Sequence, residues 1–486
     1  MKETEVANIF LVPVLDKWLL HSPLHHVTAL INDAAARSLQ DKGFRGELES
    51  IGHALAESAE PKPAPLEGDI CPSFLGIIPT RGCNIGCVYC NFGGPTAELQ
   101  HMDPKIAVAA VDWMAKTLHR HGKKDFRIHF FGGEPFVSPE LVDIVTHRAR
   151  LVSAPLGLVP YLDASTNGVF NESRCRMVGD YFGAIVLSFD GYREYHDRHR
   201  PTNGGKGTFD TVVRTAQRLS DMPAGLFLRV CITQESVSRM EEMTEWMCQE
   251  FRPEVVNFET LTPGALGARA GLQPPDPYEF ARGCVGAYRV AAEHGVKAVY
   301  SAGDTERNRL SFCPVGTDAL IVSIDGRVSG CYLLPEDWQR RGMDLDLGWV
   351  KPNGEMDLDF DAMTRVRHIP ADKPRCRDCF CQWSCAGGCH VNQTYPNSDP
   401  GYTDFCIQTR IVTACLLLRD LGCEEMVDQL LDNPRALQRL GTHNKDTLEI
   451  ELPNEAMLAA HPNRPTAPAS SGRLRSTVAG DMALLG

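Results

Sequence analysis

The stretch that decides the fold is Arg81-Gly82-Cys83-Asn84-Ile85-Gly86-Cys87-Val88-Tyr89-Cys90, which follows the apolar run 74–78. Its cysteines, Cys83, Cys87 and Cys90, are spaced C-x3-C-x2-C on a glycine-containing loop. Three thiolates cannot fill all four ligand positions of a cubane [4Fe–4S] cluster, so one iron would stay open for a small molecule. The alternative is a structural zinc site, but such sites are normally closed by four ligands.

This loop resembles the signature of the radical S-adenosylmethionine (SAM) superfamily, including the aromatic Tyr89 before the last cysteine. The resemblance implies that SAM chelates the open iron and is reductively cleaved to a 5′-deoxyadenosyl radical. Cys83, Cys87 and Cys90 would then hold the catalytic [4Fe–4S] cluster, and Tyr89 would belong to the cofactor site. The radical chemistry is the cofactor's, while the protein positions and shields it.

Length and composition set the broad class. The chain has 486 residues, too many for one ordinary core, so we expect roughly two or three domains. Its net charge of −13 argues against binding to nucleic acid or an anionic membrane, because both need basic surface. No apolar run approaches the ~18 residues of a membrane span, and the start 1–5 lacks a signal-peptide pattern. The 18 cysteines therefore indicate metal binding in a reducing cytoplasm.

Residues 1–70 are expected to form a small accessory domain. The runs 8–12 and 17–21 are typical of strands, and the pattern over 28–39 predicts a helix. A strand pair with a helix could present an edge to an extended peptide, or it could only cover the next domain. The Pro-rich stretch 61–65 predicts a linker.

Between residues 71 and 300, short apolar strands alternate with amphipathic helices. The expected strands are 74–78, 127–131, 161–164, 184–188, 226–231 and 255–258. Such β–α repeats predict an α/β fold in which a parallel sheet rolls into a partial (β/α)6 TIM-like barrel. In such folds the loops at the carboxyl ends of the strands carry the chemistry.

One polar cluster, Gly132-Gly133-Glu134-Pro135, directly follows a predicted strand. Its glycines let backbone approach a ligand, and its carboxylate can accept hydrogen bonds from an ammonium group. At this distance after the cysteine loop it resembles the radical SAM element that binds the methionyl amine of SAM.

Polar residues also follow the next strands. In the family, serines and an asparagine from these loops hydrogen-bond SAM, which implicates Ser165, Asn167 and Ser188. Arg229 lies in an otherwise apolar strand and needs a partner if it is buried. That partner could be the SAM carboxylate or the acid of a structural salt bridge.

A second cysteine array lies downstream, from Cys313 to Cys406. Its spacing is similar, position for position, to the SPASM extension of radical SAM enzymes, which houses auxiliary iron–sulfur clusters. By analogy one auxiliary cluster is bound fully, by Cys376, Cys379, Cys385 and Cys406. The other is bound by Cys313, Cys331 and Cys389. Zinc remains the alternative, because C-x2-C pairs are also common zinc ligands.

The chain departs from part of that family after Cys313. Some relatives have another cysteine there, whereas this chain has Pro314-Val315-Gly316-Thr317. Either an iron is open to a substrate or other ligand, or a residue outside the family pattern fills the position. Cys381 is a candidate for that residue, and the alternative is that Cys381 is a buried, inert thiol.

The remaining segments complete the expected organisation. Residues 301–440 would form the cysteine-rich SPASM domain. Residues 441–486 turn polar and Pro-rich, which predicts a disordered tail.

Together these features predict a radical SAM/SPASM enzyme that abstracts hydrogen from a peptide or protein. SPASM relatives mostly modify peptides, so the favoured activity is a maturase that forms a thioether or carbon–carbon crosslink in a ribosomal peptide. Formylglycine formation of the anaerobic sulfatase-maturase type is an alternative, although relatives with that activity have an aspartate where Tyr332 stands. A noncatalytic iron–sulfur or zinc scaffold is the alternative of another class. The expected partners are a peptide substrate and a reductant such as flavodoxin or ferredoxin.

Overall fold

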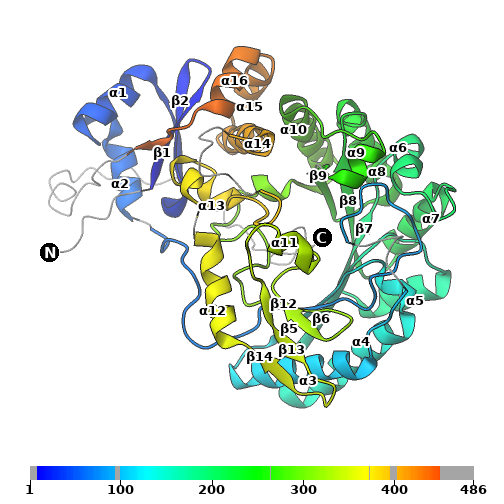
Figure 1. Ribbon diagram of the computed structural model, residues 1–486. Coiled ribbons are helices and arrows are strands. Elements are labelled where there is room, and N and C mark those ends of the chain that lie inside the picture. Colours follow the sequence, from blue (N-terminus) through cyan, green and yellow to red (C-terminus); the bar gives the residue numbers. More distant parts are fainter. Residues whose placement is uncertain are drawn as a thin grey trace.

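The computed structural model describes residues 8–57, 59–92, 99–262, 264–371, 373–393 and 402–448. Its largest element is an 11-stranded sheet in the order β10-β9-β8-β7-β6-β5-β4-β11-β12-β13-β14 (Figure 1). From β4 to β10 every neighbouring pair is parallel. These strands are β4 Leu75–Ile77, β5 Asp125–Phe130, β6 Val159–Thr166, β7 Ala184–Ser188, β8 Gly225–Ile232, β9 Val255–Thr260 and β10 Lys297–Val299.

The crossover helices cover the outer side of this curved sheet (Figure 1). They are α3 Pro104–Arg120, α4 Pro139–Leu156, α5 Glu172–Tyr181, α7 Phe209–Ser220, α8 Met240–Phe251 and α10 Pro277–Glu293, with the short α6 Arg193–His199 and α9 Ala265–Arg269 between them. The strands are apolar because both faces of a parallel sheet are covered. No helix of the described residues is long and apolar enough to cross a membrane.

The predicted α/β fold with a mostly parallel sheet is confirmed. Every predicted strand of this segment overlaps an observed one. The strand β10 was not predicted, because a run of only three residues carries little periodicity.

The segment 301–440 continues the barrel sheet. Its first strand, β11, pairs in parallel with β4, and the following strands pair antiparallel. The strands are β11 Leu320–Val322, β12 Arg327–Ser329, β13 Asp346–Val350 and β14 Met356–Leu358. The helices are α11 Pro335–Gln339, α12 Phe360–His368, α13 Gln382–Cys385, α14 Asp404–Asp420, α15 Glu424–Leu431 and α16 Pro434–Thr442, of which α14 packs on α10.

The N-terminal part is a separate four-stranded sheet in the order β15-β1-β2-β3. Its elements are β1 Ile9–Val14, β2 Lys17–Ser22, β3 Val27–Asn32, α1 Asp33–Lys42 and α2 Glu49–Glu57. The helix predicted over 28–39 is wrong in its first turn, because residues 27–32 form β3 along β2. The β-branched Val27, Thr28 and Ile31 suit a strand, and the helix starts only where Asn32 caps it through Ala35 N.

The expected disordered tail is wrong at its start. Thr447–Leu448 forms β15, which pairs with β1, so residues 443–448 run back to the N-terminal sheet. Residues 449–486 lie outside the described part of the chain.

A buried ion pair fixes this returning segment. The carboxylate of Asp446 accepts hydrogen bonds from Nη1 and Nη2 of Arg410, at 2.5 and 3.0 Å. Both side chains are at most 1% exposed. Asp446 also accepts from Phe380 N at 3.0 Å. Burial alone would raise the pKa of Asp446, but hydrogen bonds from His443 and Arg410 outweigh it and the net shift is downward.

The Arg410–Asp446 pair gives a stability prediction. The change Asp446→Ala leaves the Arg410 guanidinium buried without a counter-charge, so we expect a loss of about 3–5 kcal/mol of unfolding free energy. Denaturant or thermal unfolding monitored by circular dichroism measures it. The matched control is Asp221→Ala, whose partner Arg252 is mostly exposed, and it should change stability little. Equal effects of the two variants would contradict the prediction.

Candidate active site

The cysteine loop lies at the carboxyl end of β4, the edge at which the parallel strands end. Its backbone is tied to the segment after β7. Gly86 N donates to Pro201 O at 2.7 Å, and Val88 N donates to His199 O at 3.0 Å. The loop is therefore held from outside its own sequence.

The three thiols of the loop are free and partly enclosed. Burial raises the pKa of Cys83 to about 11 and that of Cys87 to about 12, and it also raises that of Cys90. Donors nevertheless face all three sulfurs. Phe92 N lies 3.4 Å from Cys90 Sγ, Asn167 Nδ2 lies 3.5 Å from Cys83 Sγ, and Arg200 Nη1 lies 3.8 Å from Cys87 Sγ. A buried thiolate needs a compensating cation, so these sulfurs suit an iron site.

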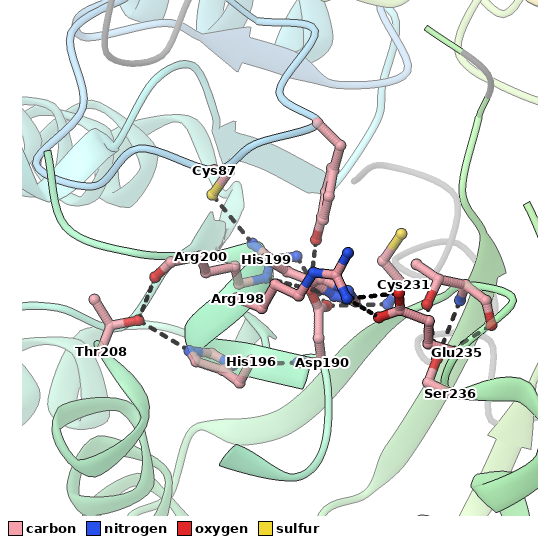
Figure 2. Close-up of polar contacts among 12 residues, drawn as sticks. Cys87, Asp190, His196, Arg198, His199, Arg200, Thr208, Cys231, Glu235 and Ser236 are labelled. Atoms are coloured by element: carbon pink, nitrogen blue, oxygen red, sulfur yellow. Dashed lines mark hydrogen bonds and ion pairs between the residues drawn. The ribbon is translucent and has the colours of Figure 1, made fainter. Parts of the chain in front are cut away.

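Asp190, just after β7, forms hydrogen bonds with several surrounding segments (Figure 2). Its buried carboxylate accepts from Tyr89 Oη at 2.7 Å, from Arg200 Nε and Nη2 at 3.0 and 3.2 Å, and from Cys231 N at 3.1 Å. His199 Nδ1 lies 3.2 Å away. Burial would raise the pKa of Asp190, but Arg200 and His199 hold it well below the usual range.

This network bears on the predicted role of Tyr89. The ring of Tyr89 lies under the guanidinium of Arg200 at 5.4 Å, and Arg200 Nη1 reaches to 3.8 Å from Cys87 Sγ. The structure thus places Tyr89 as an anchor of the cysteine loop, and a direct contact with SAM stays a prediction. The sequence analysis missed Asp190 and Arg200 as partners. Asp190 follows an apolar strand and Arg200 lies 10 residues further on, but nothing in the sequence indicates that these two residues pair.

The Gly132-Gly133 pair packs against the cysteine loop itself. Gly133 N donates to Thr80 O and Glu134 N donates to Gly82 O, each at 3.0 Å. A Cβ on Gly133 would lie 2.1 Å from Gly82 O, and one on Gly132, whose φ is +144°, would lie 2.5 Å from Thr80 O. These glycines approach the backbone of the cysteine loop, and their contact with a ligand stays a prediction.

Glu134 is buried and joins the next loop. Its Oε1 accepts from Thr166 Oγ1 at 2.8 Å and from Phe136 N at 3.1 Å, and its Oε2 accepts from Asn167 N at 2.7 Å. Burial raises the pKa of Glu134 to about 7 against the effect of these bonds. Glu134, Asn167 and Cys83 therefore lie together, while the contact of Glu134 with an ammonium group stays a prediction.

The remaining predicted SAM contacts lie on strands β6 to β8. Ser165 and Ser188 are at the carboxyl ends of β6 and β7. Arg229 of β8 donates from Nη1 to Asn257 Oδ1 at 3.2 Å on the adjacent β9. Asn257 is an uncharged amide. Its hydrogen bond with Arg229 therefore does not test the predicted pairing of Arg229 with a carboxylate.

A buried histidine–aspartate pair in the barrel escaped the sequence analysis. His129 Nδ1 contacts Asp163 Oδ1 across the β5–β6 register, and both residues are 1% exposed. Ser165 Oγ lies 3.4 Å from His129 Nε2, and the Tyr332 ring packs edge-on against His129 at 5.7 Å. The only sequence signal was a polar residue inside each apolar strand.

The first downstream set contains Cys313, Cys331 and Cys389. Burial raises the pKa of Cys313 to about 12, and the nearby Cys389 raises it further. Burial also raises the pKa of Cys331, with contributions from Cys313 and Cys389. These three thiols therefore lie near one another, although they come from separate loops.

The second downstream set contains Cys376, Cys379, Cys385 and Cys406. Burial raises the pKa of Cys376 to about 12, with contributions from Cys379 and Cys406. Burial also raises the pKa of Cys385, and the other three cysteines of the set raise it further. The predicted members of this set are therefore neighbours, and their binding of a cluster stays a prediction.

Cys381 lies against the second set. Its thiol forms a hydrogen bond with Cys379. This bond and the charge of Arg410 lower the pKa of Cys379. Burial and the neighbouring Cys379 raise the pKa of Cys381. Its position thus does not support the suggestion that Cys381 completes the first set. Within the described ranges, no three His, Cys, Asp or Glu side chains converge on a point fit for a single metal ion.

Comparisons with known proteins agree with this architecture. Residues 77–247 match the model of the Radical SAM superfamily. PqqA peptide cyclase of Gluconobacter oxydans (strain 621H) is 26% identical over 260 residues, which are 52% of this chain and 68% of that protein. The serine-type anaerobic sulfatase-maturating enzyme of Klebsiella aerogenes is 21% identical over 355 residues, which are 69% of this chain and 83% of that protein.

A solved structure shares the fold. Native anSMEcpe with bound AdoMet superposes with a TM-score of 0.55 at 17% identity, over 72% of this chain and 99% of that chain. A second structure of anSMEcpe, with bound AdoMet and the Cp18Cys peptide, has a TM-score of 0.55 at 18% identity and covers 74% of this chain and 100% of that one.

The close approach of the two loops predicts a specific cost. In Gly133→Ala the new Cβ must push the Gly82 carbonyl away, so we expect a loss of about 1–3 kcal/mol of stability and less iron bound after reconstitution. Gly204→Ala is the control, since its Cβ would have nothing closer than 4.0 Å. Thermal unfolding and iron analysis test both variants. Normal stability and iron content of Gly133→Ala would be incompatible with this packing.

Glu134 predicts a measurable titration. Because burial raises its pKa from 4.5 to about 7, its carboxyl group should stay protonated at pH 5 and ionise as the pH rises through 7. The difference infrared spectrum between the cluster-free protein and Glu134→Gln should show a protonated carboxyl band that disappears over this range. A band already absent at pH 5 would show that Glu134 is ionised and refute the shift.

Proposed function

Because residues 77–247 match the model of the Radical SAM superfamily, we propose that this chain is an enzyme that cleaves SAM reductively and abstracts hydrogen from a peptide. When bound, SAM and a [4Fe–4S] cluster supply a 5′-deoxyadenosyl radical. The observation that carries the proposal is the enclosure of Cys83, Cys87 and Cys90 on one loop at the catalytic edge of the barrel.

The surrounding residues divide into holders of the loop and holders of SAM. Asp190, Arg200 and Tyr89 fix the loop, and Asn167 donates toward Cys83 Sγ. Glu134 keeps acceptor capacity on Oε2, which takes one hydrogen bond from the protein and suits the methionyl ammonium. Other contacts with SAM are assigned to Gly132, Gly133, Ser165, Ser188 and Arg229.

The downstream cysteines fit auxiliary iron–sulfur clusters. Backbone N–H groups face the first set, from Val315 and His390 to Cys313 and from Leu333 to Cys331. Such N–H···S contacts stabilise thiolate ligands and tune cluster potentials.

Donors from arginines also face the array. Arg410 Nη1 lies 3.4 Å from Cys379 Sγ. Arg309 Nη1 is buried and has no hydrogen-bond partner among the described atoms, and Arg309 is within electrostatic reach of Cys385 and Cys313. An anionic cluster would satisfy such a donor. The set around Cys376 supplies four thiolates and the set around Cys313 three, so the latter leaves one iron for a further ligand.

A peptide substrate is supported by the relatives. One is a peptide cyclase, another matures a sulfatase, and anSMEcpe has been solved with a bound peptide. Among the described strands β3 pairs only with β2, which leaves its other backbone edge for an extended peptide. The proposed activity is therefore crosslinking within a ribosomal peptide, by a thioether or a carbon–carbon bond.

Formylglycine formation is the second candidate. The residue after Cys331 is Tyr332, whose ring is packed against His129 and Phe131. No carboxylate stands there to act as a base, which favours crosslinking over formylglycine formation. A reductant such as flavodoxin or ferredoxin would supply the electron.

Anaerobic reconstitution tests the proposal. We expect about twelve irons per chain and conversion of SAM to 5′-deoxyadenosine by the dithionite-reduced protein. The variant with Cys83, Cys87 and Cys90 all changed to Ala should bind about eight irons and form no 5′-deoxyadenosine. Binding of zinc instead of iron, or no cleavage of SAM by the loaded protein, would leave a noncatalytic metal scaffold and refute the proposal.

A further inference from the structure

A lysine lies between the two downstream cysteine sets. Lys373 is three residues before Cys376, whose backbone N–H donates to Lys373 O at 3.0 Å. At its other end, Lys373 Nζ donates to the carbonyl of Ala386. Ala386 belongs to the Cys385-x3-Cys389 link, in which Cys385 belongs to the second set and Cys389 to the first.

The link is shaped around this side chain. Ala386, Gly387 and Gly388 are all left-handed, with φ of 50°, 76° and 70°. A Cβ on Gly387 would lie 2.4 Å from Lys373 Cδ and 3.0 Å from Nζ. Glycine at 387 therefore leaves room for the lysine stem, and the left-handed turn aims the Ala386 carbonyl at its ammonium.

The position of Lys373 also determines which thiols lie close enough to interact with its charge. Lys373 is within electrostatic reach of Cys376 and Cys385 of the second set and of Cys313 and Cys389 of the first. In contrast, the sulfur that Arg410 contacts is that of Cys379, at 3.4 Å. The partly buried cation Lys373 is thus shared between both sets, and it reaches more of their thiols than Arg309, which is near Cys385 and Cys313.

We propose that Lys373 is an electrostatic bridge that raises the reduction potentials of both auxiliary clusters. This inference rests on the proposed function, since it requires clusters at both sets. A cluster gains one negative charge when it takes up one electron, and a fixed ammonium nearby stabilises that reduced form. Because the charge lies between the sets, it lowers the free energy of an electron on either one.

Redox titration tests the bridge without any substrate. The parent is the full chain with Cys83, Cys87 and Cys90 changed to Ala, reconstituted anaerobically so that only auxiliary clusters remain. In this background Lys373→Met and Lys373→Gln remove the charge, and Lys373→Arg keeps it. Lys351→Met is the control, because Lys351 is a partly exposed lysine paired with Asp357 on the β13–β14 hairpin.

Both midpoint potentials, followed by electron paramagnetic resonance, should move to more negative values in the two neutral variants. They should stay at the parent values in Lys373→Arg and Lys351→Met. Unchanged potentials, or a shift of only one cluster, would overturn the bridge while leaving the clusters established.

Loading of the clusters separates the remaining outcomes. Loss of clusters from both neutral variants but not from Lys373→Arg would also support a required positive charge. Loss from Lys373→Arg as well would assign Lys373 to packing and overturn the proposal. A parent that binds no iron at either set would overturn the auxiliary clusters themselves, and the bridge with them.

Discussion

The buried Asp190 carboxylate is the interaction on which the cysteine loop depends. It accepts hydrogen bonds from Tyr89 of the loop, from Arg200 of the following segment and from the backbone of Cys231 on β8. A buried carboxylate is costly unless it is fully paired, so these segments must be assembled before the anion is stable there. The loop is consequently positioned by the tertiary fold, and the same acid orients Arg200 toward Cys87 Sγ.

A second constraint is the contact between the cysteine loop and the Gly132-Gly133 turn. Two backbones approach so closely that no side chain fits between them. Glu134 then continues the chain of contacts to Asn167, whose amide reaches Cys83. The loops that follow β4, β5 and β6 thus meet around the sulfur of Cys83. Their contacts hold these three loops together as one unit.

The sequence predicted those parts that depend on local pattern. Apolar strands alternating with amphipathic helices indicated the parallel sheet, because both faces of its strands are covered. Cysteine spacing and the Gly-Gly-Glu turn marked the candidate site, since ligand chemistry restricts residue type.

The rest depends on partners distant in the chain. Residues 27–32 became a strand by pairing with β2, although the alanines that follow suggested an earlier helix start. The pairing of His129 with Asp163 and that of Arg410 with Asp446 join residues 34 and 36 positions apart. No periodicity encodes such pairs, and Cys381 shows the same limit, because spacing alone did not tell which set it would join.

The return of residues 443–448 has an evolutionary consequence. Asp446 pairs with Arg410 beside Cys379, and two residues later the chain adds β15 to the N-terminal sheet. The N-terminal sheet and the surroundings of the second cysteine set therefore share one short segment. The sheet is not an interchangeable module: a chimera that replaces residues 8–57 must also match the edge offered by β15. Substitutions in the N-terminal sheet should accordingly be correlated with substitutions around the second cysteine set.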